Sequence, residues 1–220
     1  MKNKVPVLSY TFLSTYWSCP KQAYHKYIAK DLPRVESEAM RWGNRVHEAM
    51  DKRIKGEPLP SDMVKWEPLV APLGAIPGVK SEQAVGLTRE GTPTDFWSGD
   101  VWIRGKIDVL AVHGDRAFIA DWKTGKKRED PTELQIFGLF VKELYPDVKA
   151  VTGRYVWLQD SSIGDTHDVS NEMPMYKRLY DTSYEVEKLV ETGAEWVPKP
   201  NGLCRAYCDV LSCSHNGRKR

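Results

Sequence analysis

The chain has 220 residues, enough for one folded domain with a sizeable core. Hydrophobic residues make up 41% and charged residues 28% of it, which are the proportions of a globular protein and exclude a disordered one. The net charge of +2 does not by itself indicate a nucleic-acid partner, and it is compatible with a basic face beside an acidic site. With no run of about 18 apolar residues and no apolar centre of a signal peptide, we expect a cytoplasmic protein without a membrane segment.

Hydrophobic periodicity and turn signals predict an α/β protein. Ser9 or Thr11 caps the first predicted helix, and Pro20 starts a second helical turn in it. The predicted elements, in chain order, are helices over residues 9–28 and 36–55, a proline-rich connector over 57–78 with a short helix near 61–66, a strand over 79–88, two strands on either side of Gly114-Asp115, a helix over 131–144, strands over 149–159 and 163–169, and a helix over 175–191.

The segment 101–125 organises the chain. Apolar and β-branched residues flank Gly114-Asp115, which predicts two strands joined by a two-residue turn with positive φ at Gly114. In that register Asp108 lies directly opposite Asp121. Opposed carboxylates repel each other, and a divalent cation converts this repulsion into chelation. Acidic residues at strand ends are more often solvated, but the register and the buried strand before Asp121 favour a metal site.

A family resemblance rests on this segment. The Gly-Lys-Ile-Asp sequence ending at Asp108, the hairpin, and the Ile-Ala-Asp-Trp-Lys-Thr-Gly sequence at 119–125 resemble the PD-(D/E)XK nucleases, and among them the RecB-like branch. The resemblance implies metal-dependent hydrolysis of DNA phosphodiester bonds, with Asp108 and Asp121 as acidic positions and Lys123 as the lysine. It also implies a restriction-endonuclease-like core, a mixed sheet flanked by helices, and a metal contact from the backbone carbonyl of Trp122.

Residues before the hairpin match further positions of the family. Gly43 and His47 are four residues apart, hence on one helical face, and RecB-like nucleases have a metal-binding histidine at this spacing from a glycine. Without the resemblance, a histidine on an amphipathic helix is more often a core or surface residue. Glu82 matches a glutamate that the family often has, although an exposed strand residue is the simpler interpretation. Imidazole beside carboxylates suits Mn²⁺ better than Mg²⁺, and either ion is a candidate.

Residues after the hairpin add to the resemblance. Gln135 matches a glutamine of the family that helps position water or phosphate, whereas Leu139 departs from the aromatic residue that usually follows it. The basic run Lys126, Lys127 and Arg128 is typical of a solvated loop. Beside a phosphodiester site the same run would attract the DNA backbone.

Four cysteines occur: Cys19, Cys204, Cys208 and Cys213. Three cysteines in a turn-rich tail indicate zinc or an iron–sulfur cluster, since disulfides are rare in a reducing compartment. RecB-like nucleases with a 4Fe–4S cluster, such as the CRISPR-associated adaptation exonucleases and the AddB nuclease domain, have one cysteine before the core and three after it, and the four cysteines match that layout. The spacing in the tail departs from theirs, so Zn²⁺ is the alternative, with His215 as a replacement ligand. Cys19 alone would be read as a small buried residue.

The resemblance predicts one nuclease domain with three parts: a helical part at 1–78 carrying Cys19 and His47, a catalytic sheet and helix at 79–170, and a helix with a cysteine-rich tail at 171–220. The expected activity is that of a divalent-metal-dependent deoxyribonuclease, an exonuclease acting in DNA processing, recombination or repair, with DNA and proteins of a processing complex as partners. The metal ion would activate water, and Lys123 would orient or deprotonate it. A non-catalytic DNA-binding protein or an adaptor with a structural zinc or iron–sulfur site is the alternative.

Overall fold

A computed structural model describes residues 5–33, 36–128 and 130–219 of the chain. Contacts divide the chain into two units. The central unit comprises residues 36–176, and the terminal unit combines both ends, residues 1–35 and 177–220. In the described part of the chain, the helices are all too short or too polar to cross a membrane.

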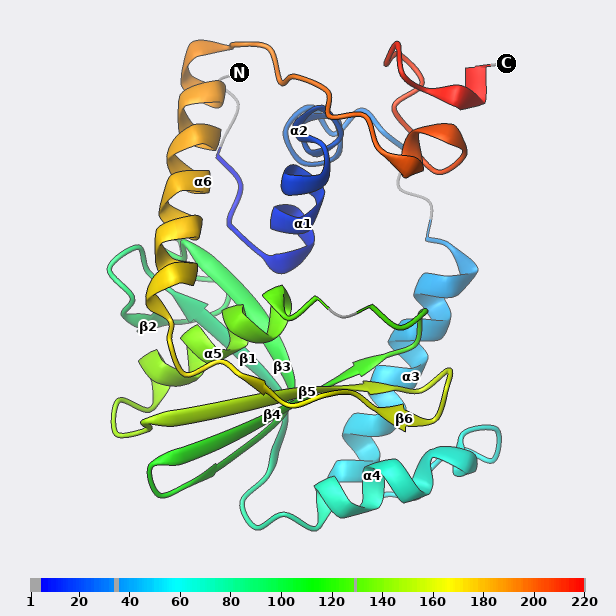
Figure 1. Cartoon of the computed structure of the whole chain (residues 1–220), viewed down its shortest axis with the longest axis vertical. Helices are drawn as coiled ribbons and strands as arrows, with labels where there is room; N and C mark the ends of the chain where they lie inside the picture. The colour runs from blue at the N-terminus through cyan, green and yellow to red at the C-terminus, as the bar shows by residue number, and fades with distance from the viewer. Residues whose placement is uncertain (1–4, 34–35, 129, 220) are drawn as a thin grey trace. The chain divides into compact units, whose positions relative to one another are not determined.

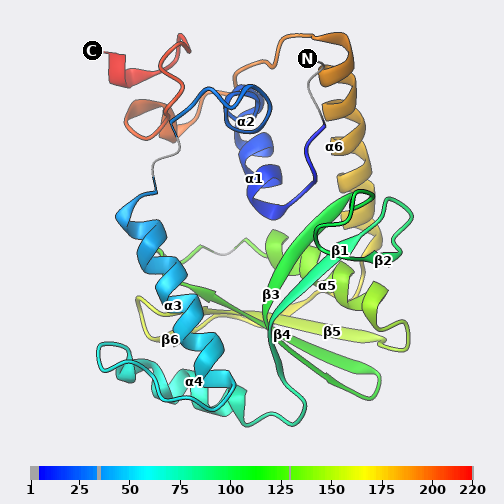
Figure 2. The same cartoon turned by 180° about the vertical axis from the view of Figure 1, so that it is seen from behind.

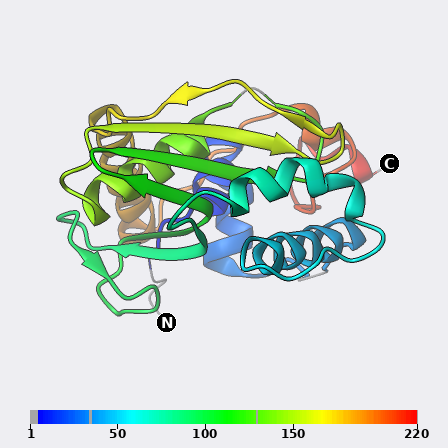
Figure 3. The same cartoon turned by 90° about the horizontal axis from the view of Figure 1, so that it is seen from below.

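The central unit is built on a mixed sheet, which Figures 1 and 2 show from two sides. The strand order is β2-β1-β3-β4-β5-β6, and β7 also pairs with β5. β4 and β5 run parallel, the other described pairs run antiparallel, and the long strands lie side by side in Figure 3. The strands are β1 Lys80–Leu87, β2 Pro93–Thr94, β3 Ile103–His113, β4 Arg116–Lys123, β5 Ala150–Trp157, β6 Ser162–Ile163 and β7 His167–Asp168.

The predicted hairpin is confirmed, including its register. β3 and β4 pair from His113↔Arg116 to Val109↔Ala120, and Gly114 in the turn has a φ of 57°. The regular pairing ends one step before Asp108 and Asp121, so these carboxylates occupy the point where the two strands separate. Because the strands are no longer paired there, side chains from other elements can contact Asp108 and Asp121.

Helix α5, Thr132–Leu144, connects the parallel strands β4 and β5 and packs against the sheet. It contacts the sheet closely at Gly105, where an added Cβ would lie 2.8 Å from the ring of Phe140. Gly105 is part of the sequence that resembles the nuclease family. In this fold it is needed because the aromatic ring of α5 lies where a side chain would be.

Helix α3, Glu38–Ile54, begins at Ser37, whose hydroxyl accepts the amide of Met40. It ends before Gly56, which has a φ of 99°. Its apolar face packs with helix α4 and one part of the sheet. The core residues of this cluster include Val46, Met50, Trp66, Val70, Val109, Ala120, Trp122 and Leu158.

The connector predicted for residues 57–78 is wrong over much of its length. A 3₁₀ turn, η2 Val64–Trp66, is followed by helix α4, Glu67–Gly74. Pro68 is tolerated because it lies in the first turn, where no intrahelical amide bond is lost. The helix forms despite Pro72 because its apolar side chains join the core, and the Trp66 indole N–H donates to the carbonyl of Leu158 at 2.8 Å.

The terminal unit holds the remaining helices. α1, Tyr10–Ser18, is capped by Ser9 and stops at Cys19, which is extended; Pro20 then starts α2, Pro20–Ala23, as predicted. A π-helical turn, η1 Tyr24–Ala29, completes a stretch predicted as one helix. The predicted C-terminal helix is α6, Met173–Thr192, whose residues from 177 onward belong to this unit. Two 3₁₀ turns follow, η3 Gly202–Arg205 and η4 Gly217–Lys219.

Candidate metal site and cysteine pocket

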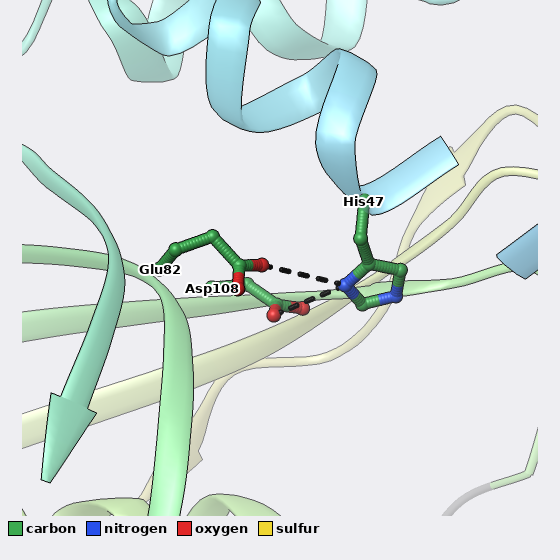
Figure 4. A group of neighbouring side chains, drawn as sticks. All are labelled: His47, Glu82 and Asp108. Atoms are coloured by element: carbon green, nitrogen blue, oxygen red, sulfur yellow. Dashed lines mark hydrogen bonds and ion pairs between the residues drawn. The ribbon is translucent and has the colours of Figure 1, made fainter. Parts of the chain in front are cut away.

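Three side chains from three elements of the central unit meet at one point (Figure 4). His47 comes from α3, Glu82 from β1 and Asp108 from β3, and their ligand atoms all lie within 4.8 Å of one another. Nδ1 of His47 is 3.1 Å from Oδ1 of Asp108 and 3.8 Å from Oε1 of Glu82. Ligands at adjacent corners of an octahedron about 2.1 Å from a metal ion lie about 3 Å apart, so these three residues, the metal-site group, fit a divalent ion.

Asp108 is fixed by its second oxygen. Its side chain is buried, and Oδ2 accepts the backbone N–H of Trp122 at 2.9 Å. This bond links β3 to β4 just beyond the point where their regular pairing ends. It leaves Oδ1 directed at His47. The amide of Trp122 is thus engaged with Asp108, while the metal contact from its carbonyl stays a prediction.

Glu82 reaches the group through an unusual backbone conformation. Its φ is 49°, in the left-handed region, although its neighbours Ser81 and Gln83 pair regularly with β3. Such a conformation costs a residue other than glycine about 1–2 kcal/mol. Strain of this kind persists where the surrounding structure enforces it, and it concentrates at functional sites. The strained backbone of Glu82 accompanies the placement of its carboxylate beside His47. Nζ of Lys106 donates to Oε2 of the same carboxylate at 3.2 Å.

The charges of the group favour a cation at this point. Burial lowers the pKa of His47, but hydrogen bonds with Asp108 and Glu82 outweigh burial and raise the pKa to about 10. The bond with His47 lowers the pKa of Glu82, against the effect of burial. At neutral pH the imidazolium proton therefore lies between nitrogen and carboxylate. A metal ion must displace that proton to bind.

Asp121, predicted as a metal ligand, is turned toward a lysine. Its carboxylate is buried and makes no hydrogen bond through Oδ2 in the described part of the chain, but Nζ of Lys123 lies 2.6 Å from that oxygen as an ion pair. The structure does not bring Asp121 into the metal-site group, because the ligand atoms that lie within 4.8 Å of one another are those of His47, Glu82 and Asp108. Its negative charge is nevertheless close enough to raise the pKa of His47.

The lysine has a second partner that sequence reasoning missed. Nζ of Lys123 donates to Oε2 of Glu133 at 2.5 Å, and we call Asp121, Lys123 and Glu133 the lysine clamp. Burial lowers the pKa of Lys123, but the two carboxylates outweigh burial and raise it above its ordinary value. Burial raises the pKa values of Asp121 and Glu133, and the charge of Lys123 opposes this effect. Glu133 could have been noticed as the acidic residue in the first turn of the helix that follows the lysine strand.

Other predicted residues lie outside these groups. Gln135 is partly exposed, and no hydrogen bond of its side chain is found in the described part of the chain. Leu139 is fully buried in the core. Lys126, Lys127 and Arg128 are exposed in the loop after β4. Their roles toward DNA or water stay predictions.

All four cysteines line one small pocket of the terminal unit, the cysteine pocket, together with Pro198, Pro200 and His215. The thiols are free, and two sulfurs accept backbone amides at 3.4 Å: Cys19 from Lys199 and Cys204 from Asn201. Burial and the nearby thiols raise the pKa of Cys208, against a backbone hydrogen bond.

The sulfurs are not drawn together as in a finished zinc site. Four thiolates around a zinc ion, each about 2.3 Å from it, lie about 3.8 Å apart. Within residues 5–33, 36–128 and 130–219, no three cysteine sulfurs lie within 4.8 Å of one another. Each iron of a 4Fe–4S cluster holds its own thiolate. The iron–sulfur cluster and the zinc ion both stay predictions.

Comparisons with known proteins address the fold. No family model and no curated protein matches the chain. Solved structures do match it, among them one described as the crystal structure of SSO0001. The two structures align over 97% of this chain and 88% of the SSO0001 chain, with a TM-score of 0.53 and 13% sequence identity. At this identity the match concerns the fold alone. The chain is an α/β protein with a mixed sheet flanked by helices, and it shares that architecture with SSO0001.

Proposed function

We propose that the protein is a divalent-metal-dependent deoxyribonuclease of the PD-(D/E)XK type, in the RecB-like branch. The observation that carries the proposal is the meeting of His47, Glu82 and Asp108 beside the lysine clamp. A histidine and two carboxylates suit Mn²⁺ or Mg²⁺, and a partly buried ammonium next to them suits a phosphate that gains charge during cleavage.

His47, Glu82 and Asp108 would hold the ion, which would supply a water molecule of lowered pKa and neutralise charge on the scissile phosphate. The chain prepares the site in three ways. Trp122 holds Asp108 through its amide, β1 places Glu82 through its strained backbone, and His47 gives up its proton when the ion binds.

Lys123 acts mainly through its charge. Its raised pKa keeps the amine protonated, so it is poorly suited to accept a proton from water. A fixed ammonium in a mostly buried position stabilises negative charge that develops on the phosphate. The exposed basic run Lys126, Lys127 and Arg128 follows the same strand and would contact neighbouring phosphates of the DNA.

We also propose that the cysteine pocket holds a 4Fe–4S cluster, with Zn²⁺ as the alternative. Support comes from four cysteines lining one pocket although the first is at position 19 and the last at position 213, and from two amides that donate to sulfur. Hydrogen bonds to the sulfurs are a regular feature around iron–sulfur clusters. Its role would be structural, joining Cys19 to the tail.

The test is a cleavage assay with end-labelled linear, circular and single-stranded DNA, each with Mg²⁺ and with Mn²⁺. Linear DNA should be degraded from its ends only when a divalent ion is present. Asp108→Asn should abolish cleavage, whereas Asp115→Asn should not, because Asp115 lies in the exposed hairpin turn. Equal cleavage by wild type and Asp108→Asn, or no cleavage of any DNA by the wild type, would contradict the proposal.

A further inference from the structure

The terminal unit contains a second cavity, of about 290 Å³, which we call the aromatic pocket. Its lining comes from residues 21–28, in α2 and η1, and from residues 189–196, at and after the C-terminal end of α6. Both segments belong to the terminal unit. Pockets for small molecules have volumes of about 300 Å³ and above, a largely apolar lining and a few polar groups that fix the ligand. The aromatic pocket meets these conditions.

The apolar part of the lining includes two aromatic rings. Trp196 is buried, and the centroid of its ring lies 5.7 Å from that of Tyr24. Buried Ile28 and partly buried Leu189 and Val190 line the pocket with them. A flat ring can stack on an aromatic side chain whatever its pattern of hydrogen-bonding groups, which is how proteins bind nucleobases without reading their sequence.

The polar part of the lining consists of Lys21, His25 and Glu195. Nζ of Lys21 is 4.0 Å from Oε1 of Glu195, and the side chain of Glu195 is 76% exposed. A solvated ion pair at this separation contributes little to stability, so either group can take a ligand as its partner at small cost. Nδ1 of His25 lies 3.0 Å from both carboxylate oxygens of Asp31, which orients the ring and makes Nε2 the nitrogen that a ligand would meet.

The backbone of the pocket is also unusual. Tyr24, His25 and Ile28 lie on η1, the π-helical turn Tyr24–Ala29. Such turns are rare, because they give up the regular hydrogen bonding of an α-helix, and they occur frequently at functional sites. Here the turn carries an aromatic, a polar and an apolar residue of the same cavity.

We infer that the aromatic pocket binds a mononucleotide. The base packs on the aromatic rings of Tyr24 and Trp196, and the phosphate contacts Lys21 and His25. The carboxylate of Glu195 accepts a hydroxyl of the sugar, a contact that acidic residues make in other nucleotide sites. The metal-site group takes no part in this binding, so the inference stands or falls independently of the proposed function.

Other kinds of ligand fit the lining less well. An anion without a ring would be repelled by Glu195 and would gain nothing from Tyr24 and Trp196. A purely apolar molecule would make no use of Lys21 and His25 and would desolvate them without a compensating hydrogen bond. A ring that carries a hydroxyl-bearing sugar and a phosphate matches all three parts of the lining.

The experiment is isothermal titration of the full chain with AMP, dAMP, adenosine and inorganic phosphate, in buffer without divalent ions so that the metal-site group is not occupied. We expect one nucleotide per chain, with adenosine and phosphate each binding at least about tenfold more weakly than AMP. Lys21→Met should weaken AMP about tenfold and leave adenosine unchanged, because it removes a charge-assisted contact to the phosphate alone. Lys188→Met is the matched control, since Lys188 is an exposed lysine of α6 that does not line the pocket.

A second variant, Val190→Trp, places a large side chain in the cavity and should abolish binding of both AMP and adenosine, with circular dichroism as the check on folding. A preference for AMP over dAMP would assign the pocket to ribonucleotides, and equal affinity would include deoxynucleotides released from DNA; both results support the inference.

Three results would overturn it: no binding of either nucleotide to the wild type, adenosine binding as tightly as AMP, or equal AMP affinities for Lys21→Met and Lys188→Met. The first two are measured on the wild type and need no variant to fold.

Discussion

The metal-site group and the cysteine pocket differ in how far their ligands are already gathered. His47, Glu82 and Asp108 come from neighbouring elements of one sheet and its helix, and their ligand atoms lie within 4.8 Å of one another. The cysteines come from both ends of the chain and line one pocket, but within the described residues no three of their sulfurs are that close. The first site is therefore organised by the fold, whereas the proposed group of the second would have to draw the cysteines into their final geometry.

A further contrast lies in what stabilises each site without a metal ion. The metal-site group has a proton on His47 and the neighbouring lysine clamp has its own ammonium, so both are electrostatically compensated. In the cysteine pocket, backbone amides donate to Cys19 and Cys204, a backbone hydrogen bond reaches Cys208, and apolar residues pack nearby. Loss of the bound group should thus cost folding stability in the terminal unit and activity in the central unit.

Among variants that leave the metal-site group intact, the largest effect should come from Lys123→Met, which removes the charge and keeps much of the volume. Without the ammonium, the cleavage rate should fall by about two to four decades, while DNA binding is retained. Steady-state kinetics and a DNA-binding titration separate these effects. If affinity for DNA fell as much as the rate, Lys123 would be a phosphate-binding residue instead.

Lys123→Met should also destabilise the central unit. Removing one partner of a buried ion pair leaves carboxylates unpaired, at a cost of about 3–5 kcal/mol, reduced here because part of the lysine side chain is solvated. Thermal unfolding at neutral pH measures this loss. Adding Glu133→Gln should recover part of it, since one unpaired carboxylate is removed.

Cys19→Ala sharpens the contrast between the two sites. Because Cys19 is distant from the other cysteines in sequence, its removal should lower iron or zinc content and thermal stability together, by a few kcal/mol. The Mn²⁺ affinity of the central unit should be unchanged in the protein that remains folded. Full metal content with unchanged unfolding would show that Cys19 is only a buried core residue.

His215→Ala is the companion variant for the cysteine pocket. If four cysteines bind the group, metal content is unaffected by this change. Loss of zinc in His215→Ala would instead assign the fourth ligand to the histidine. Metal analysis and the visible absorption spectrum of protein prepared without oxygen distinguish iron–sulfur from zinc.

The stability of the metal-free protein should depend on pH through His47. Its folded pKa is raised to about 10 from an ordinary value near 6.5, so its stabilising contribution is complete below about pH 6.5 and is lost as the pH rises through about 10. His47→Asn should flatten this part of the unfolding profile, whereas His113→Asn, in the exposed end of β3, should not. The affinity for Mn²⁺ should rise over the same range, because the proton competes with the ion.

The smallest effect should come from relieving the strain at Glu82. Glu82→Gly places a residue without a Cβ at a φ of 49°, which should stabilise the metal-free protein by about 1 kcal/mol relative to Glu82→Ala. Both variants should bind Mn²⁺ more weakly than the wild type. Equal unfolding temperatures for the two variants would show that the backbone at this position is not strained in solution.

The sequence predicted the elements whose signals are local. The Gly-Asp turn determined the hairpin register, and periodicity located α3, α5 and α6. Helix α4 was not predicted, because its prolines are typical of a connecting loop. The helix is stabilised instead by packing against Trp66 and the sheet. Sequence patterns within a short segment do not reveal stabilisation by contacts with residues that are distant in sequence.

For the candidate site, the sequence predicted which residues lie near one another better than it predicted which side chains contact each other. It predicted the register of the hairpin correctly, but the regular pairing ends at Val109 and Ala120. Beyond that point Asp108 contacts His47, and Asp121 contacts Lys123. It treated Glu82 as a minor candidate because a strand residue with positive φ cannot be foreseen from its neighbours. It missed Glu133 because only the packing of α5 directs that carboxylate at the lysine.

The most direct test of the metal site is anomalous diffraction at the manganese edge from a crystal of the protein grown with Mn²⁺. We expect one anomalous peak in the central unit, bonded to Nδ1 of His47 and to the carboxylates of Glu82 and Asp108. A map without a peak at these three side chains, from a crystal in which Mn²⁺ binding has been verified, would contradict it.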